Sequence, residues 1–272
     1  MESRHRFVFA GPGSWPLEQA VRYAMERDFR LVDFNADSPP NYPATFDPQR
    51  VRAIRSLADK HDVQLGLHTL SAVNMAEITP VMHAAADTYL IQNFDLASSL
   101  GCRYVICHGG YHFSSDYSER LAAAIDRLRR ASDWADQRNL DVYFENHNKE
   151  PDNAEIHYMP RDVAETGRFF AAVTSPRLKW AFNVGHAYLV ADGFDGFLDA
   201  FGVGKIGQVR LNDTHGRYEE HLIPGQGIVD FKHVFRRLGE RGYDGPYTLD
   251  FGGPEERVTW RDTFAAWLDD SP

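Results

Sequence analysis

The chain has 272 residues, 43% apolar and 25% charged, and its 29 Lys and Arg against 39 Asp and Glu give a formal net charge of −10. This composition is typical of a folded globular protein and excludes a largely disordered chain, while the acidic balance argues against attraction to DNA or anionic membranes, which clustered Lys and Arg supply. The apolar runs are no longer than strands, and residues 1–11 lack the apolar core of a signal peptide, so we expect a cytoplasmic protein without a membrane span.

Short apolar segments alternate with longer amphipathic segments along the chain. The apolar segments predict strands at residues 6–10, 31–35, 63–69, 103–108, 141–146, 178–183, 208–212 and 246–251. The segments between them predict helices at residues 16–28, 48–61, 80–100 and 118–139, from about 161, at 194–201 and 231–241, and up to 268. Pro16 and Pro48 suit a first helical turn, and Asp47 is a candidate N-cap.

Eight strand–helix units in a chain of this length match the size of a (β/α)8 barrel. Strands rich in Val, Ile, Leu, Phe and Tyr, separated by helices, indicate a parallel sheet covered by helices. A doubly wound open sheet is the alternative, but the segment after the first strand, AGPGSWP, lacks the glycine spacing of a dinucleotide-binding turn. We therefore predict an α/β fold, a TIM barrel, with one domain over residues 1–272.

Polar residues stand where the predicted strands end. In TIM barrels the active site lies at the C-terminal ends of the strands, so these residues should meet at one mouth. Imidazoles and carboxylates gathered there are ligands for a divalent cation such as Zn or Mn, and they also serve acid–base chemistry near neutral pH. The strand ends carry His68, His108, Glu145, Asn146, Asn183, Arg210 and Asp250, and the loops that follow add His186, Glu219 and His221.

With these residues in place, the sequence resembles the xylose isomerase-like barrel superfamily. That superfamily includes sugar and sugar-phosphate isomerases and epimerases, related dehydratases, and abasic-site nucleases of the endonuclease IV type. The resemblance covers residues 7–268 and rests on seven motifs. These are His68, His108-Gly109-Gly110, Glu145-Asn146, Asn183-Val184-Gly185-His186 (Asp-x-x-His in the family), Arg210-Leu211-Asn212-Asp213 (His-Leu-x-Asp), HLIPGQG at 221–227 (His-x-x-Pro-Gly-Glu-Gly) and Thr248-Leu249-Asp250, where the family usually ends with Glu.

The chain departs from the superfamily at the metal site. In the one-metal sugar isomerases, Glu, Asp, His and Glu on strands five to eight hold the cation, and here those places have Glu145, Asn183, Arg210 and Asp250. Asn183 brings no negative charge, and Arg210 is a permanent cation that cannot ligate a metal. We expect Arg210 to pair with Glu145 and Asp250 and to stand in for the usual cation. The alternative is a guanidinium that points elsewhere or forms a plain buried ion pair.

The resemblance to endonuclease IV, which carries three zinc ions, implies two further ligand groups. One group is His68, His108 and Glu145. The other is His186, Glu219 and His221, with Glu219 in place of an Asp. A divalent metal, Zn or Mn, is therefore expected in one of these two groups, while the third group is the one altered by Arg210.

The resemblance implies an isomerase or epimerase that transfers a proton α to a carbonyl on a small polyhydroxylated substrate, phosphorylated or not. Glu145 and Asp250 would exchange the proton, and Arg210 or a metal would stabilise the enediolate. Asn183 and Asn146 would orient the substrate.

A dehydratase or lyase of the same superfamily starts with the same step and stays open, as does a metal-independent binding barrel. An abasic-site endonuclease conflicts with the net charge of −10 and with the altered metal site. We expect a small-molecule substrate and neither nucleic acid nor membrane as a partner. Relatives often dimerise or tetramerise, so a homo-oligomer also stays open.

Overall fold

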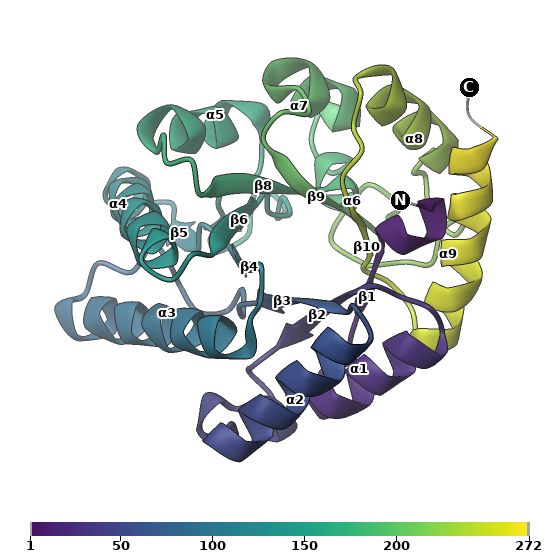
Figure 1. Ribbon diagram of the computed structural model, residues 1–272. Coiled ribbons are helices and arrows are strands. Elements are labelled where there is room, and N and C mark those ends of the chain that lie inside the picture. Colours follow the sequence, from purple (N-terminus) through teal and green to yellow (C-terminus); the bar gives the residue numbers. More distant parts are fainter. Residues whose placement is uncertain (1, 271–272) are drawn as a thin grey trace.

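The computed structural model describes residues 2–270 and has eight parallel strands closed into a barrel with helices around it (Figure 1). Around the barrel the order is β1, β2, β3, β4, β6, β8, β9, β10, and β10 pairs with β1 to close the sheet. The predicted TIM barrel is confirmed. The bounds are Phe7–Ala10 (β1), Leu31–Asn35 (β2), Gln64–His68 (β3), Tyr104–Cys107 (β4), Asp141–Glu145 (β6), Leu178–Asn183 (β8), Ile206–Leu211 (β9) and Tyr247–Leu249 (β10).

The helices pack their apolar faces against the outside of the barrel, where most of the apolar core lies. Asp47 is the N-cap of α2, because its side chain accepts a hydrogen bond from the Arg50 backbone N–H at 2.8 Å. The α-helices are Leu17–Glu26 (α1), Pro48–Lys60 (α2), Pro80–Leu100 (α3), Tyr117–Asp136 (α4), Val163–Ala172 (α5), Val184–Ala187 (α6), Gly193–Phe201 (α7), Phe231–Glu240 (α8) and Pro254–Asp269 (α9), and the short 3-10 helices are Ser3–Arg6, Pro39–Asn41 and Pro43–Thr45.

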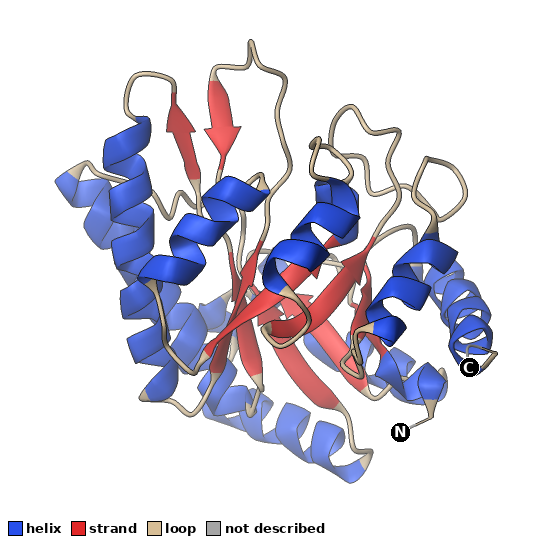
Figure 2. Cartoon of the chain, turned by 90° about the horizontal axis from the view of Figure 1, so that it is seen from above, coloured by secondary structure: helices blue, strands red, loops and turns tan. Residues whose placement is uncertain are grey.

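A second, small sheet that sequence reasoning missed lies beyond the C-terminal ends of the barrel strands (Figure 2). Strand β5 (Tyr111–Phe113) follows β4, strand β7 (Ile156–Tyr158) follows β6, and the two pair antiparallel with His112 opposite His157. The pairing ties together the two loops that follow β4 and β6. These loops therefore form one wall of the barrel mouth.

The inside of the barrel changes from aromatic to polar along its axis. Tyr104 and Tyr143 stack with ring centroids 4.1 Å apart, and they precede His108 and Glu145 in their strands by four and two residues. Residues two apart in a strand point to the same side, so His108 and Glu145 also face inward, nearer the mouth. Gly66 makes room for the rings, because a Cβ at Gly66 would lie 2.2 Å from Tyr104 Cε2.

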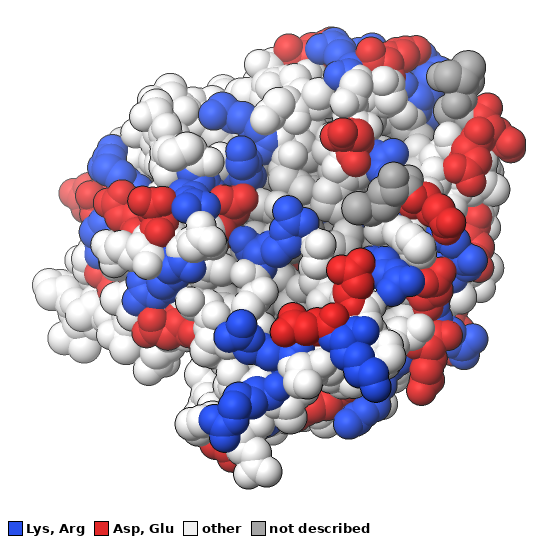
Figure 3. Space-filling model, viewed as in Figure 1, with Lys and Arg blue, Asp and Glu red and all other residues white. Residues whose placement is uncertain are grey.

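The surface charge is mixed. On the face shown in Figure 3, Lys and Arg lie among Asp and Glu and do not gather into one basic surface. Within residues 2–270, no helix is long and apolar enough to span a bilayer.

Candidate active site

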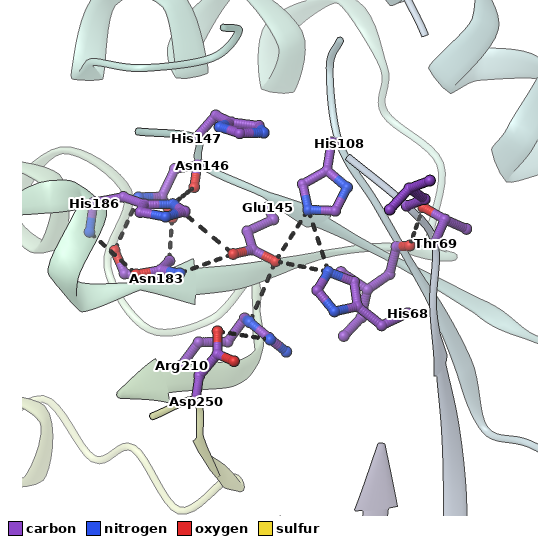
Figure 4. Close-up of polar contacts among 12 residues, drawn as sticks. His68, Thr69, His108, Glu145, Asn146, His147, Asn183, His186, Arg210 and Asp250 are labelled. Carbon is purple, nitrogen blue, oxygen red and sulfur yellow. Dashed lines mark hydrogen bonds and ion pairs between the residues drawn. The ribbon is translucent and has the colours of Figure 1, made fainter. Parts of the chain in front are cut away.

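Arg210 on β9 lies at the centre of the mouth and faces three carboxylates (Figure 4). Its Nη2 donates a hydrogen bond to Asp250 Oδ2 at 2.8 Å, and its Nε lies 3.3 Å from Glu145 Oε2. The third carboxylate is Asp33, whose Oδ2 lies 3.4 Å from Arg210 Nη1. The Arg210 side chain is only 2% exposed, so these ion pairs are largely shielded from water.

Asp33 on β2 belongs to this cluster, although sequence reasoning did not single it out. Its Oδ1 accepts a hydrogen bond from the Tyr104 hydroxyl at 2.5 Å, and its Oδ2 lies 3.3 Å from Gln208 Nε2. Burial raises the pKa of Asp33 and outweighs the lowering by Arg210 and Tyr104. Asp33 thus holds the guanidinium from the side away from the mouth.

Asn183 and Asn146 connect Glu145 to strand β8. Asn183 Nδ2 donates to Glu145 Oε1 at 2.9 Å, and Asn183 Oδ1 accepts from the His186 backbone N–H and from Asn212 Nδ2, both at 3.1 Å. Asn146 Oδ1 accepts from the Asn183 backbone N–H at 2.8 Å, and Asn146 Nδ2 donates to the Asn183 carbonyl at 3.0 Å. Asn183 therefore presents N–H, not a lone pair, to Glu145, and its oxygen already serves two donors.

The first histidine group is buried beside Arg210. His68 Nε2 and His108 Nε2 lie 3.2 Å apart, and they lie 3.5 and 3.6 Å from Glu145 Oε2. Among the described residues, no group donates a hydrogen bond to the buried Glu145 Oε2, and the buried His108 Nδ1 has no hydrogen-bond partner. An orphaned carboxylate oxygen facing two imidazole nitrogens fits a bound cation, but His108 lacks the outer hydrogen bond that usually orients a metal-bound histidine.

The second histidine group has those outer hydrogen bonds. His186 Nδ1 lies 2.8 Å from the Asn146 carbonyl oxygen and His221 Nδ1 lies 2.7 Å from the Asp250 carbonyl oxygen. A carbonyl oxygen only accepts, so each Nδ1 carries a proton and each Nε2 keeps its lone pair in the neutral ring. The two Nε2 atoms meet Glu219 Oε1 at 3.0 and 2.7 Å.

Two lone pairs and a carboxylate oxygen repel one another unless a cation or extra protons join them. In the metal-free protein a proton does so, because Asp250 and Glu219 raise the pKa of His221 to about 9 against the lowering by burial. Glu219 is 38% exposed, which leaves this group accessible from the mouth. By donor chemistry and orientation, the residues fit a divalent metal with three protein ligands.

The carboxylates of the mouth are ionised at neutral pH. Burial raises the pKa of Asp250, but Arg210 and His221 lower it by more, so that the pKa is about 2. For Glu145 burial again raises the pKa, but Arg210, His108 and His68 bring it well below its usual range. Against burial, His186 and His221 likewise lower the pKa of Glu219.

The loop that carries His221 depends on a fully buried carboxylate, Asp213. Its two oxygens accept hydrogen bonds from the backbone N–H groups of Thr214, Gly225, Gly227 and Val229 at 2.9 to 3.0 Å. Asp213 stands where the family motif has an Asp, yet here its lone pairs are used by the backbone. It shapes the loop instead of facing the cluster.

The structure brings all the candidate residues to one mouth. They include two histidine groups, and Glu145, Asn183 and Arg210 lie between the imidazoles of the two groups. Sequence reasoning also passed over His147 as a site residue. Its buried ring stacks on Tyr158 with centroids 4.1 Å apart, and it lies between His108 and His186. A polar residue inside an apolar strand, such as Asp33 in LVDFN, was the signal available for the inner partner.

Comparison with known proteins finds curated sugar epimerases among the relatives of this chain. Fructoselysine 3-epimerase of Escherichia coli O157:H7 is 22% identical over 243 residues, which cover 86% of this chain and 85% of that protein. Ketose 3-epimerase of Arthrobacter globiformis is 25% identical over 245 residues, which cover 86% of this chain and 77% of that protein. The chain is thus a distant relative of sugar epimerases.

Among solved structures, the fold of a D-tagatose 3-epimerase-like protein matches with a TM-score of 0.82 at 20% identity, over 97% of both chains. At this identity the likeness shows the fold alone. The sequence profile described as "Xylose isomerase-like TIM barrel" matches residues 21–270. The chain therefore belongs to the xylose isomerase-like TIM barrel family.

Proposed function

We propose that this protein is a sugar epimerase or isomerase that transfers a proton α to a carbonyl on a small polyhydroxylated substrate. The observation that carries the proposal is the buried guanidinium of Arg210 in contact with Glu145 and Asp250. This reaction needs two groups that can exchange a proton and one positive group that stabilises the enediolate. Two ionised carboxylates and one permanent cation meet that requirement.

In this proposal the carbonyl oxygen and the neighbouring hydroxyl oxygen of the substrate bind to Arg210. One of the two carboxylates, Glu145 or Asp250, takes the proton from the carbon that carries this hydroxyl group. The electron pair of the broken C–H bond moves into the enediolate. The other carboxylate, once it has taken up a proton from solvent, returns it to the opposite face while the first acid releases its proton to solvent; alternatively, the first acid returns its own proton to the neighbouring carbon while the hydroxyl proton moves to the former carbonyl oxygen. The first outcome is epimerisation and the second is isomerisation, and neither changes the atom count.

The low basicity of the two carboxylates in the free protein is consistent with this role. Arg210 lowers the pKa of both groups, and its N–H groups are the ones that a substrate oxygen would engage. When Arg210 binds a developing oxyanion, it stabilises the carboxylates less, so their basicity rises as the reaction proceeds. Asn183 and Asn146 hold Glu145 and β8 in register throughout, because their amides are bonded on both sides.

A metal would complement Arg210. The group His186, Glu219 and His221 fits a divalent ion by its donors and their orientation, and His68, His108 and Glu145 form the second candidate. A bound divalent ion supplies Lewis-acid polarisation of a substrate oxygen. The protein's own residues set where that oxygen lies, since Asp250 bonds both to Arg210 through its carboxylate and to His221 through its carbonyl.

The test is isotope exchange. The purified protein is incubated in D2O with D-fructose, D-tagatose, D-psicose and D-sorbose, and NMR follows deuterium at the carbons next to the carbonyl. We expect deuterium incorporation and a new ketose, both reduced roughly 100-fold or more in Asp250→Asn, as for loss of an acid–base group. The control Asp262→Asn removes an exposed carboxylate and should be unchanged.

Absence of exchange and of product with every ketose, in protein loaded with Zn or Mn, contradicts the proposal. Loss of a hydroxyl group as water, detected as a new carbonyl product, assigns the chain to the dehydratases instead. Metal analysis accompanies the assay, and full activity without bound metal would make Arg210 the only cation that the reaction uses.

A further inference from the structure

Resting on the proposed function, we infer that the substrate carries no phosphate group, so the protein acts on free sugars. TIM barrels that bind phosphate commonly do so with backbone N–H groups in the loops after the seventh and eighth strands, here β9 and β10. In this chain, carboxylates of the protein bind four backbone N–H groups in the loop after β9 and one, that of Gly253, in the loop after β10.

The glycine-rich turn after β9 is filled by Asp213. Four backbone N–H groups, including those of Gly225 and Gly227, converge on this carboxylate, as such groups converge on phosphate in an anion-binding nest. Asp213 is fully buried, so a phosphate that displaced it would leave a buried charge without its donors. The turn packs closely against the preceding segment, because a Cβ at Gly227 would lie 2.2 Å from the Thr214 carbonyl oxygen.

The N-termini of the helices that follow, α8 and α9, are also occupied by carboxylates of the protein. At the start of α8, Asp230 accepts a hydrogen bond from the His233 backbone N–H at 3.0 Å. At the start of α9, Glu256 accepts one from the Gly253 backbone N–H at 3.1 Å, and Glu255 adds a second negative charge to the first turn. A phosphate dianion would meet these carboxylates at each of the two helix N-termini.

The arginines near these loops do not restore a phosphate site. Arg257 in the first turn of α9 donates to the backbone carbonyls of Ala10, Phe251 and Gly252, which occupies its guanidinium. Arg217 in the loop after β9 is exposed, but Glu219 and Glu220 follow it closely. The partly exposed groups of the mouth include Asp250 and Glu219, whose charge favours a neutral ligand over an anion.

Hydroxyl groups suit this mouth better than phosphate does. A sugar hydroxyl both donates and accepts, so it can donate to the carboxylates of Glu145 and Asp250 and accept from an N–H of Arg210. Phosphate offers only acceptor oxygens near neutral pH and would face those carboxylates directly. The same chemistry that excludes phosphate therefore selects polyhydroxylated molecules.

Two measurements test this inference independently of turnover. Binding of D-fructose and of D-fructose 6-phosphate is compared by ligand-observed NMR at constant ionic strength, and inorganic phosphate is titrated while the amide signals of Gly225, Gly227 and Gly253 are followed. We expect D-fructose 6-phosphate to bind at least tenfold more weakly than D-fructose, and the three amide signals to stay in place. Glu256→Gln should raise the affinity for the phosphorylated sugar roughly two- to fivefold, the worth of one charge at a helix N-terminus, while Glu240→Gln on α8 should not.

Tighter binding of D-fructose 6-phosphate, or phosphate-induced shifts of these amides, would overturn the inference. If Arg217→Gln then abolished that binding, the phosphate contact would belong to Arg217. Failure of the proposed function is a separate result, because it appears as no isotope exchange on either sugar. The inorganic phosphate titration still decides the inference in that case.

Discussion

Replacing Arg210 with Met should destabilise the protein, and by more at pH 7 than at pH 5. Met has similar length but no charge, so the substitution leaves Glu145, Asp250 and Asp33 buried without their common cation. Removing one partner of a buried ion pair costs about 3–5 kcal/mol, much of it the desolvation of the charge left behind. Asp250 alone, with its pKa lowered from 3.8 to about 2, corresponds to about 2 kcal/mol of stabilisation at neutral pH.

The direction of the pH effect follows from comparing the pKa values of these carboxyl groups in the folded and in the unfolded protein. In the native protein the folded pKa values of Glu145 and Asp250 lie below their unfolded values, so this stabilisation is present above about pH 4 and is lost as the pH falls toward 2. Once Arg210 is gone, we expect burial to raise these pKa values. The loss of stability caused by the substitution should therefore be smaller at pH 5 than at pH 7.

The assay is urea unfolding monitored by tryptophan fluorescence, with both proteins dialysed against EDTA so that metal loss cannot account for the difference. The control is Arg4→Met, which breaks an exposed ion pair with Asp262 and should cost less than about 1 kcal/mol. A loss below about 1 kcal/mol for Arg210→Met, or a loss that is larger at pH 5 than at pH 7, would refute the reasoning.

Three further predictions concern the barrel interior, the loop and the metal. Gly66→Ala would place a Cβ 2.2 Å from a tyrosine ring and should cost about 1–3 kcal/mol in thermal unfolding, whereas Gly204→Ala, with nothing within 4 Å, should be neutral or nearly so. Asp213→Asn turns one acceptor into a donor and leaves backbone N–H groups unpaired, so hydrogen exchange in residues 225–229 should accelerate; unchanged protection would show that another group holds the loop. His221→Ala should lower the zinc content measured by mass spectrometry more than His68→Ala does, because His221 has the oriented tautomer, and the reverse order would assign the metal to the first group.

Much of the fold could be predicted because the strand signal is local. Short apolar segments mark every barrel strand, most of them ending in a polar residue, and the predicted ends at Asn35 and Asn183 coincide with observed strand ends. The β5–β7 sheet could not be found in this way. Its two strands have three residues each and pair across more than forty residues, so neither carries a periodic pattern of its own.

The active site was likewise predictable only in part. Residues at strand ends were identified because topology alone brings them together, and the loop residues Glu219 and His221 followed from the family motif. What sequence could not supply was how side chains share their hydrogen bonds. Asp213 matches a family Asp but serves the backbone, and Asp33 lies in space that Gly66 leaves open, since a Cβ at Gly66 would lie 2.6 Å from Asp33 Oδ1.

The stacked rings of Tyr104 and Tyr143 give the barrel a closed floor. Together with the buried side chains of Ile106 and Ala181 they occupy its axis on the side away from the mouth. Hydrogen from solvent would then reach a bound substrate from the side of the mouth. Deuterium in the product formed in D2O would therefore measure how readily Glu145 and Asp250 exchange protons with solvent during one turnover.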